Sequence, residues 1–253
     1  MPENAHLTRG LMRETLTRGS LVLGLSLLLA GCGVRSVADL QPAAEAGDAA
    51  AQNELGLRYA NGDGVPRDAV QAAEWFRKAA EHGDDEGRYR YGMALIRGDG
   101  VAEDEAAGAK LVLQVAETGH LRAQFNAGRC FSFGWGVAPN PTQAVMWYER
   151  AAKRGYAAAQ HRLGLAYYDG DGVTADPAMA VAWFAKAAEQ NHPEGLFALG
   201  YCTVNGRGIT KDLPTGMKLY QRAADLNITQ AMNNPSARHL RRGRDPQDCS
   251  LPA

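Results

Sequence analysis

The sequence of 253 residues lacks an excess of charge of one sign. It has 27 Lys and Arg side chains against 28 Asp and Glu, which gives a formal net charge of −1 at pH 7. Domains that bind the phosphate backbone of nucleic acids usually carry a clustered positive excess. The charge balance therefore gives no indication of a nucleic-acid partner.

A hydrophobic run long enough to cross a bilayer is also missing. The apolar stretch from Leu21 to Ala30 has about ten residues, whereas a spanning helix needs about 20. Basic residues precede this stretch at Arg9, Arg13 and Arg18. A basic segment, a short apolar core and a cleavage site of small residues are typical of a secretory signal. We therefore predict a signal peptide over residues 1–31 rather than a transmembrane helix.

Signatures of catalysis are absent as well. None of the four serines after residue 31 fits the S-x-x-K or G-x-S-x-G patterns of serine hydrolases. The segment from Asp169 to Gly172 resembles the start of a calcium loop, but Thr174 stands where such a loop requires glycine. We interpret this segment as a turn. No enzyme activity and no cofactor are expected.

The histidines of the central region are His82, His120, His161 and His192. They never form an H-x-x-x-H pattern or lie beside a C-x-x-C, so we expect no zinc site. Apart from His161, which the groove hypothesis below uses, we interpret them as solvated loop residues.

What the sequence does contain is a repeat of 36 residues. It is marked by paired glycines at Gly62 and Gly64, Gly98 and Gly100, Gly134 and Gly136, Gly170 and Gly172, and Gly206 and Gly208. A period between about 20 and 50 residues is typical of solenoids, propellers and arrays. Apolar residues recur within each unit at helical spacing, so we predict two helices per unit.

The ends of these helices are marked by residues that suit helix caps. In the unit Asp48–Gly83, we expect the first helix to extend from about Ala49 to Ala60 and to end at Gly62, which suits a left-handed cap. The second helix begins at Asp68, whose side chain can accept the free N–H groups of the first turn. All five units have Asp or Asn at this phase.

Large and small residues alternate in a way that predicts close helix packing. The second helix has a large apolar pair at Trp75-Phe76, Leu111-Val112, Trp147-Tyr148, Trp183-Phe184 and Leu219-Tyr220. The middle of the first helix has glycine at Gly56, Gly92, Gly128, Gly164 and Gly200. Glycine within a helix costs about 1 kcal/mol relative to alanine. We interpret this column as a notch in which the neighbouring helix packs.

This pattern predicts an all-α fold: a right-handed α-solenoid of five stacked helix-turn-helix repeats and a partial sixth. The sixth begins at Asn227, breaks at Pro235 and is expected to cover the last hydrophobic face. The predicted domains are the signal peptide, a lipidated tether with the start of the first helical region (32–46), the solenoid (47–234) and a flexible basic tail (235–253). Residues Ser36 to about Ala46 are interpreted as tether.

The repeat resembles the Sel1-like repeat, a relative of the tetratricopeptide repeat. The matching residues of the first unit are Ala51-Gln52, Leu55-Gly56, Tyr59, Gly62-Asp63-Gly64-Val65, Asp68, Trp75-Phe76, Lys78-Ala79-Ala80 and Gly83. The resemblance covers about residues 41–234 and departs from the pattern only locally, as at Leu111-Val112 and Thr203. It implies a curved scaffold or adaptor that binds proteins or peptides on its inner surface and has no common catalytic site. Some Sel1-like proteins have been discussed as penicillin-binding or β-lactamase-like, and the usual serine motifs for that chemistry are missing here.

Leu29-Ala30-Gly31-Cys32 closely resembles the bacterial lipobox, which implies that Cys32 becomes a lipid-modified N-terminus. Gly33 is not the aspartate associated with retention in the inner membrane, so we favour the outer membrane, facing the periplasm. Translation could begin at Met1 or at Met12.

The remaining cysteines are odd in number. Cys130 and Cys202 occupy the same phase two units apart, farther than the Cα separation of about 7 Å that a disulfide tolerates. We expect them to be buried free thiols. A bond between Cys202 and Cys249 in the tail stays open as an alternative.

The first helix of each unit also has positions that vary between units, as a surface freed from packing would. Aromatic residues and arginine are enriched at binding hot spots. On this basis the predicted groove consists of Tyr89, Phe125, Arg129, His161, Tyr168, Phe197 and Tyr201. The alternative is that Tyr89, Phe125 and Phe197 only pack against adjacent helices.

Three functions follow from these observations. The preferred one is a non-enzymatic, lipid-anchored envelope adaptor that binds a protein or peptide in this groove. An envelope hydrolase of the cell-wall or β-lactam class and a purely structural subunit of an envelope complex are the alternatives.

Overall fold

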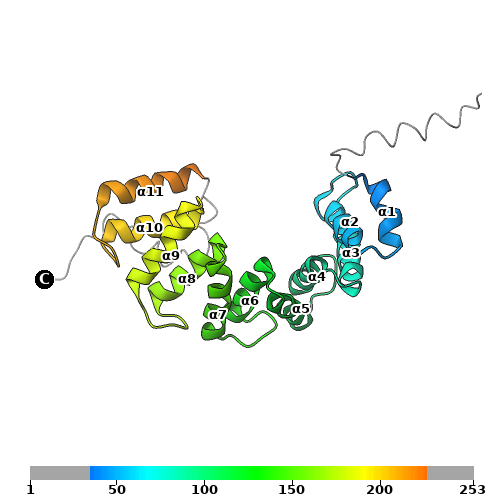
Figure 1. The fold of residues 1–253 in the computed structure, drawn as a ribbon, viewed down its shortest axis with the longest axis horizontal. Helices are drawn as coiled ribbons and strands as arrows, with labels where there is room; N and C mark the ends of the chain where they lie inside the picture. The colour runs from blue at the N-terminus through cyan, green and yellow to red at the C-terminus, as the bar shows by residue number, and fades with distance from the viewer. Residues whose placement is uncertain (1–34, 227–253) are drawn as a thin grey trace, which may run out of the picture.

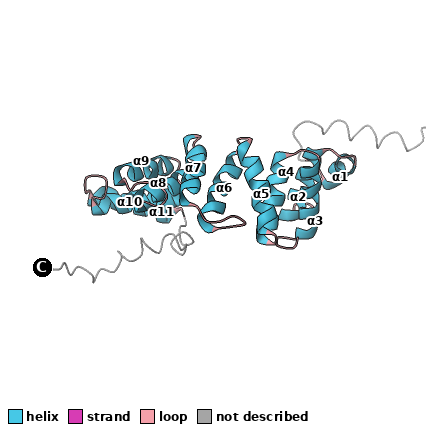
Figure 2. Ribbon diagram, turned by 90° about the horizontal axis from the view of Figure 1, so that it is seen from below, coloured by secondary structure: helices cyan, strands magenta, loops and turns pink. Residues whose placement is uncertain are grey.

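The computed structural model describes residues 35–226, which form helices and contain no strand. The helices are α1 (Val37–Glu45), α2 (Ala49–Asn61), α3 (Ala69–Glu81), α4 (Asp85–Arg97), α5 (Glu105–Glu117), α6 (Leu121–Phe133), α7 (Pro141–Lys153), α8 (Ala157–Asp169), α9 (Pro177–Glu189), α10 (Pro193–Asn205) and α11 (Leu213–Asp225). They follow one another along an arc, with α1 and α11 at opposite ends (Figure 1). Figure 2 shows the same succession from below as one elongated row. The prediction of an all-α solenoid is confirmed.

Each predicted repeat is a hairpin of two packed helices, from α2 with α3 to α10 with α11. The first helices of neighbouring repeats also touch: α2 contacts α4, and α8 contacts α10. Successive elements of an arc converge on its inner side. The first helices therefore line the inner side, toward which the arc in Figure 1 opens.

The predicted caps form as expected. The Asp68 side chain accepts hydrogen bonds from the N–H groups of Val70 at 2.9 Å and Gln71 at 3.0 Å. Gly62 ends α2 in the left-handed region with φ of 81°. A left-handed glycine ends the first helix of every hairpin, and an Asp or Asn side chain caps the start of every second helix. The helix ends therefore repeat along the chain with the period of the sequence.

The glycine notches also form. A Cβ atom at Gly56 would lie 2.6 Å from the ring of Phe76, and one at Gly164 would lie 2.5 Å from the ring of Phe184. Both distances are shorter than any real contact of a Cβ atom. The ring of the second helix therefore lies directly on the backbone of the first helix of its own repeat.

In the second to fifth repeats the second glycine of the turn has a separate role that links repeats. Gly136 has φ of 64°, and a Cβ atom there would overlap the backbone of Glu105, at the start of α5 in the preceding repeat. Gly208 approaches Pro177 in the same way. These turns pack against the preceding repeat's second helix, and they set how closely the repeats stack.

The interpretation of Ser36–Ala46 as a tether is wrong. Ser36 caps α1 with a capping box, and Leu40 and Ala44 on this helix are fully buried against Leu55 and Trp75. Leu40 lies 36 residues before Phe76, so α1 occupies the place of the second helix of a preceding unit. The repeat phase therefore extends further toward the N-terminus than the glycine pairs indicate.

A hydrogen bond that recurs along the stack confirms this placement. The Gln52 amide donates to the carbonyl of Ala44 at 2.8 Å, just as Gln124 donates to Ala116 and Gln160 to Ala152. These acceptors share one phase of the repeat. The helix α1 thus covers the N-terminal end of the solenoid with the same contacts that join two repeats.

Cys130 and Cys202 are buried free thiols, as expected. Burial raises the pKa of each to about 11. Within residues 35–226 no helix is long and apolar enough to cross a bilayer. Cys32, Cys249, the signal peptide, the partial sixth repeat and the basic tail lie outside the described residues.

Candidate protein-interaction groove

The seven residues predicted to line a groove all lie on the first helices of the repeats. Tyr89 is on α4, Phe125 and Arg129 are on α6, His161 and Tyr168 are on α8, and Phe197 and Tyr201 are on α10. None of them is fully exposed: Tyr89 and Tyr168 are buried, with exposed fractions of 6% and 8%, and the other five are half-buried. The hypothesis of a groove lined by exposed rings is therefore too simple.

Tyr89 is held on all sides by its neighbours. Its hydroxyl accepts a hydrogen bond from Asn126 Nδ2 at 2.9 Å, and its ring lies 5.3 Å from the ring of His120. Burial raises the pKa of the Tyr89 phenol. Packing between α4 and α6 accounts for this residue, which is the alternative that the sequence left open.

Phe125 and Phe197 combine packing with partial exposure. Phe125 lies 5.9 Å from the ring of Tyr148 and 5.2 Å from that of Tyr156, and Phe197 lies 5.1 Å from Tyr220. Each ring thus contacts a tyrosine of the second helix of its own repeat, and Phe125 also contacts Tyr156, the N-cap of α8. Their outer edges remain available to a partner.

Tyr168 on α8 and Tyr201 on α10 lie close to each other. The ring of Tyr168 is covered by the guanidinium of Arg207, 3.6 Å from the ring centroid, and lies 6.3 Å from the ring of Tyr201. Burial raises the pKa of the Tyr168 phenol well above its usual range. Tyr168 therefore supports the half-exposed Tyr201 rather than lining the surface itself.

The interpretation as solvated loop residues holds for His82, which is exposed at the end of α3, and is wrong for His120 and His192. His120 and His192 are N-caps whose Nδ1 atoms accept hydrogen bonds from Ala123 and Gly195 at 3.2 Å. His82 Nδ1 lies 2.8 Å from Gln52 Oε1. These side chains fasten the junctions between repeats. No group of three or more metal-ligating side chains occurs among the residues that the structure describes.

His161, which we assigned to the groove, lies against His192. The two rings are 5.6 Å apart, and the ring of Phe184 lies 5.9 Å from His161. Burial and the charges of His192 and Arg162 lower the pKa of His161 well below 6.5. His161 is therefore neutral at pH 7 and offers a partner a half-buried, uncharged ring.

Arg129 has the most unusual environment of the seven. Its guanidinium lies 4.5 Å from the ring centroid of Trp135 and donates to Asn126 Oδ1 at 3.3 Å. Its Nε is buried without a hydrogen-bond partner. Burial, followed by the positive charges of Arg162 and Arg97, lowers the pKa of Arg129. A charged donor is thus held partly desolvated beside other positive charges.

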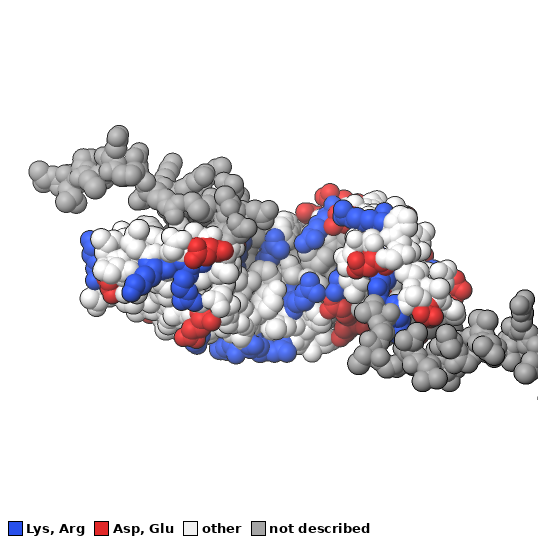
Figure 3. Space-filling model, turned by 90° about the horizontal axis from the view of Figure 1, so that it is seen from above, with Lys and Arg blue, Asp and Glu red and all other residues white. Residues whose placement is uncertain are grey.

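The sequence reasoning assigned no role to six further arginines on the first helices. They are Arg58 on α2, Arg88, Arg90 and Arg97 on α4, Arg122 on α6 and Arg162 on α8. Figure 3 looks onto the open side of the arc and shows Lys and Arg atoms over its middle part and toward its ends, with Asp and Glu atoms among them. Only Arg90 and Arg162 share a phase of the repeat, so a search for residues repeated in every unit passes over these arginines. The uneven distribution of arginine along the chain was the available signal, because the first helix of the fifth repeat, residues 193–205, has no arginine.

The only serine on the inner helices α2, α4, α6, α8 and α10 is Ser132, which bears on the hydrolase alternative. Its Oγ lies 2.9 Å from the hydroxyl of Tyr148, in a cavity of about 330 Å³ that Arg162 also lines. Burial raises the pKa of Tyr148, so this phenol stays protonated at neutral pH and is a poor general base. The contact is therefore a hydrogen bond between two helices rather than a nucleophile with its base.

The repeats were compared with known families and structures. A model of the Sel1 repeat matches residues 49–84, 85–120, 121–156, 157–192 and 193–228. The chain belongs to the Sel1 repeat family. Each Sel1 repeat comprises one of the five hairpins described above, and α1 precedes the first of them.

Solved structures share this Sel1 architecture. The protective antigen c5321 of uropathogenic Escherichia coli, described as having an SLR fold, is 36% identical with a TM-score of 0.71; the match covers 76% of this chain and 41% of that protein. A Sel1 repeat protein from Oxalobacter formigenes is 29% identical with a TM-score of 0.68, covering 81% and 87% of the two chains. A putative Sel1 repeat protein from Klebsiella pneumoniae, 19% identical with a TM-score of 0.51, covers 82% and 99% and shows the fold alone.

Among curated proteins none matches this chain. The chain spans less than half the length of the Escherichia coli antigen, so that antigen indicates the fold and the family rather than a shared activity. Sel1 repeat proteins generally mediate protein–protein interactions. The inner face of this solenoid is the surface that such an interaction would use.

Proposed function

We propose that this Sel1 repeat protein is a non-enzymatic adaptor of the bacterial envelope, anchored by a lipid on Cys32, which binds a protein or peptide on the inner face of its arc. The observation that carries the proposal is the continuous inner face built from first helices, where half-buried aromatic side chains lie beside arginines. Phe125, Arg129 and Tyr201 represent this face. Aromatic residues and arginine are the types that dominate binding energy in protein interfaces.

The environment of Arg129 supports the same proposal. A guanidinium stacked on Trp135 with a buried, unpartnered Nε is already partly desolvated in the free protein. A partner carboxylate that reaches the exposed part of the Arg129 guanidinium gains a charge-assisted hydrogen bond.

The binding proposal is tested by site-specific photo-crosslinking in cells. A photoreactive amino acid replaces Arg129 or Tyr201 on the inner face; matched controls replace Arg150 or Lys153, which are exposed on α7. We expect one discrete crosslinked species from the inner positions and none from the controls. Equal crosslinking from both sets, or none from either, would overturn the inner face as the binding surface.

The choice of inner positions follows from burial. Replacing Tyr89 would remove the hydrogen bond to Asn126 and damage packing, so loss of a partner in that variant would not locate a site.

The alternative of a purely structural role has its own test. If the function of the complex survives when Arg129 and Tyr201 are both replaced by alanine, the purely structural role is favoured instead.

Membrane anchoring is tested separately. We expect a Cys32→Ser variant to lose incorporation of labelled palmitate and to move from the membrane fraction to the soluble periplasmic fraction. Unchanged fractionation of the variant would contradict lipid anchoring at Cys32. Separation of inner from outer membranes on a density gradient then tests the expected outer-membrane location.

A further inference from the structure

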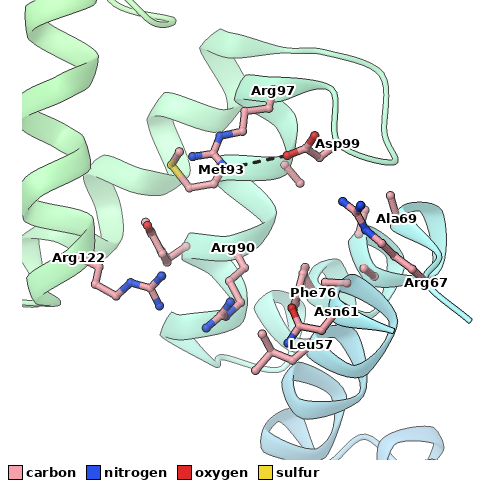
Figure 4. A pocket seen from close by; sticks show the side chains of 15 residues that line it. Leu57, Asn61, Arg67, Ala69, Phe76, Arg90, Met93, Arg97, Asp99 and Arg122 are labelled. Atoms are coloured by element: carbon pink, nitrogen blue, oxygen red, sulfur yellow. Dashed lines mark ion pairs between the residues drawn. The ribbon is translucent and has the colours of Figure 1, made fainter. Parts of the chain in front are cut away.

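The first two repeats and α6 enclose a cavity of about 260 Å³ on the inner face (Figure 4). Its floor is apolar and includes Phe76, Tyr89 and Met93, each with an exposed fraction of 6%. Its walls include four arginines and a single carboxylate, that of Asp99. Because the walls come from α2, α3, α4 and α6, the cavity exists only when the repeats are stacked.

The arginines reach this cavity from different elements. Figure 4 shows the guanidinium groups of Arg90 from α4 and Arg122 from α6 converging on one side, with Arg97 near Met93 and Arg67 on the opposite side. The four groups thus surround an apolar floor. This arrangement can hold an anion at the rim while an apolar group fills the centre.

The positive charge of the cavity exceeds its counter-charge. The carboxylate of Glu86 is shared between Arg90 at 2.5 Å, Arg122 at 3.3 Å and His120 at 2.7 Å. Arg97 has only Asp99, 4.0 Å away, with both side chains more than half exposed. Pairs of this kind contribute little in water.

Two arginines at the cavity differ in how accessible they are to a ligand. The Nε of Arg90 is buried without a hydrogen-bond partner. Arg67 is exposed and forms no ion pair within the part of the chain that the structure describes. Further along the inner face, the unpartnered Nε of Arg129 continues the same series of positive groups.

We propose that this cavity is the anchor point for an acidic peptide, with Glu or Asp carboxylates of the peptide bound at Arg67 and at Arg97 on opposite sides and an apolar side chain between them on the floor of Phe76 and Met93. The inference rests on the proposed adaptor function and names the chemistry of its partner. Guanidinium groups bind carboxylates through two parallel hydrogen bonds.

The apolar floor and the local character of the arginine excess favour a peptide over a nucleic acid. Nucleic-acid affinity comes from many phosphate contacts along a continuous basic surface. Here the excess of arginine is local, because the whole chain has a net charge of −1. An acidic peptide with interspersed apolar residues complements both the arginines and the rings of the inner face.

The test uses the full-length protein in detergent and a fluorescein-labelled decapeptide of alternating Glu and Leu. Fluorescence anisotropy compares it with the same peptide carrying Gln in place of Glu. We expect at least tenfold tighter binding of the Glu peptide and a loss of that preference as salt rises. Equal binding of the two peptides would overturn the proposal, because the apolar residues would then carry the affinity.

Matched variants locate the site. Arg67→Gln with Arg97→Gln removes two exposed guanidinium groups that do not hold Glu86, and Arg150→Gln with Lys153→Gln removes the same charge from α7. We expect at least a tenfold loss of Glu-peptide binding in the first pair and a change within twofold in the second. Equal losses would show that only the net charge matters and would contradict the site.

Reversing the charges of Arg67 and Arg97 predicts a gain of binding, which an unfolded or damaged variant would not show. Arg67→Glu with Arg97→Glu should bind a Lys and Leu decapeptide more tightly than the wild-type protein does. Circular dichroism checks that each variant is folded. Competition by inorganic phosphate or by a ten-nucleotide DNA strand at the same concentration as the Glu peptide would overturn the assignment to peptides.

Failure of this inference and failure of the adaptor function give different results. If the Arg67→Gln, Arg97→Gln variant retains the crosslinked partner in cells, the adaptor function stands and the acidic anchor is wrong. If the Glu peptide binds in vitro but no partner crosslinks in cells, the cavity binds acidic peptides and the adaptor function is wrong.

Discussion

The N-terminal end of the arc is covered by a short helix, whereas its C-terminal end, as far as residue 226, presents apolar side chains to solvent. At the first end, Leu40 of α1 is fully buried against Leu55. At the other end, Leu213 and Met217 of α11 are 53% and 55% exposed, and only Gly216 and Ala223 of that helix are buried. The same repeat unit is thus stabilised by one neighbour at an end and by two in the middle.

This comparison shows where the stability of a solenoid lies. A repeat gains most of its free energy from the interfaces with its neighbours. Contacts between repeats should therefore be costly to disturb, while equivalent positions on an uncovered face should tolerate change. Four predictions test this difference.

The largest effect is expected for Gly208→Ala compared with Gly64→Ala. Both glycines have positive φ, 74° and 80°, but a Cβ atom at Gly208 would overlap the backbone of Pro177, whereas one at Gly64 has only Val37 at 3.8 Å. We expect a loss of more than about 4 kcal/mol at Gly208, against about 1–2 kcal/mol for the backbone strain alone at Gly64. Urea denaturation followed by circular dichroism measures both, and equal losses would contradict backbone contact between repeats.

The second effect concerns helix α1, which covers the N-terminal end of the solenoid. Leu40→Ala should reduce the free energy of unfolding by about 2–5 kcal/mol, because it leaves a cavity between α1 and the first repeat. The matched Met217→Ala on α11 should change it by less than about 0.5 kcal/mol. If Met217→Ala costs as much as Leu40→Ala, the exposed face of α11 is covered in the folded protein.

A smaller effect is expected from the helix caps. Asp68→Ala removes the acceptor for Val70 and Gln71 and should cost about 1 kcal/mol. Asp212→Ala removes the corresponding acceptor for Thr215 but should cost less in global unfolding, since only Gly216 and Ala223 of α11 are buried. Hydrogen exchange distinguishes fraying of α11 from global unfolding, and an equal global cost would argue against an independently fraying end.

The smallest effect depends on pH and belongs to the C-terminal half. The pKa of His161 is lowered by burial, then by His192 and Arg162, so the unfolded chain binds this proton more readily than the folded chain. The stability from neutral His161 is present above pH 6.5 and is lost as the pH falls toward the lowered folded value.

Replacement of His161 by Asn should therefore flatten the decline in melting temperature between pH 6.5 and lower pH. His192, whose pKa is also lowered, remains in this variant and keeps part of the decline. An unchanged slope would mean that His161 does not titrate differently in the folded protein. Glu194, near His192, is the acidic group facing this pair.

The sequence predicted the repeated features well because each is local. Helix caps at Asp68 and Gly62 depend on residues within one turn, and the notch at Gly56 depends on Phe76 of the same hairpin. Signals repeated five times leave little ambiguity of register. The prediction placed the start of the first helical region within residues 32–46 but did not recognise all of helix α1, because this segment has no preceding glycine pair, although Leu40 keeps the phase of Phe76.

The groove was predicted less well because exposure depends on several repeats together. Tyr89 varies between units as a surface residue would, yet Asn126 and Arg122 from the next repeat cover it. Arg97 and Arg122 line the same cavity only because α4 and α6 follow one another along the arc. Nothing in the columns of the repeat gives this proximity.

The sequence by itself determined the helices, their ends, the pairing of helices into hairpins and the repetition of those hairpins, since these follow from spacing and from contacts within 36 residues. The curvature of the stack decided which side chains of the first helices are covered and which converge. The cavity with Arg67, Arg90, Arg97 and Arg122 is a product of that curvature. Its charge arises where separate repeats approach one another, a property that no single repeat encodes.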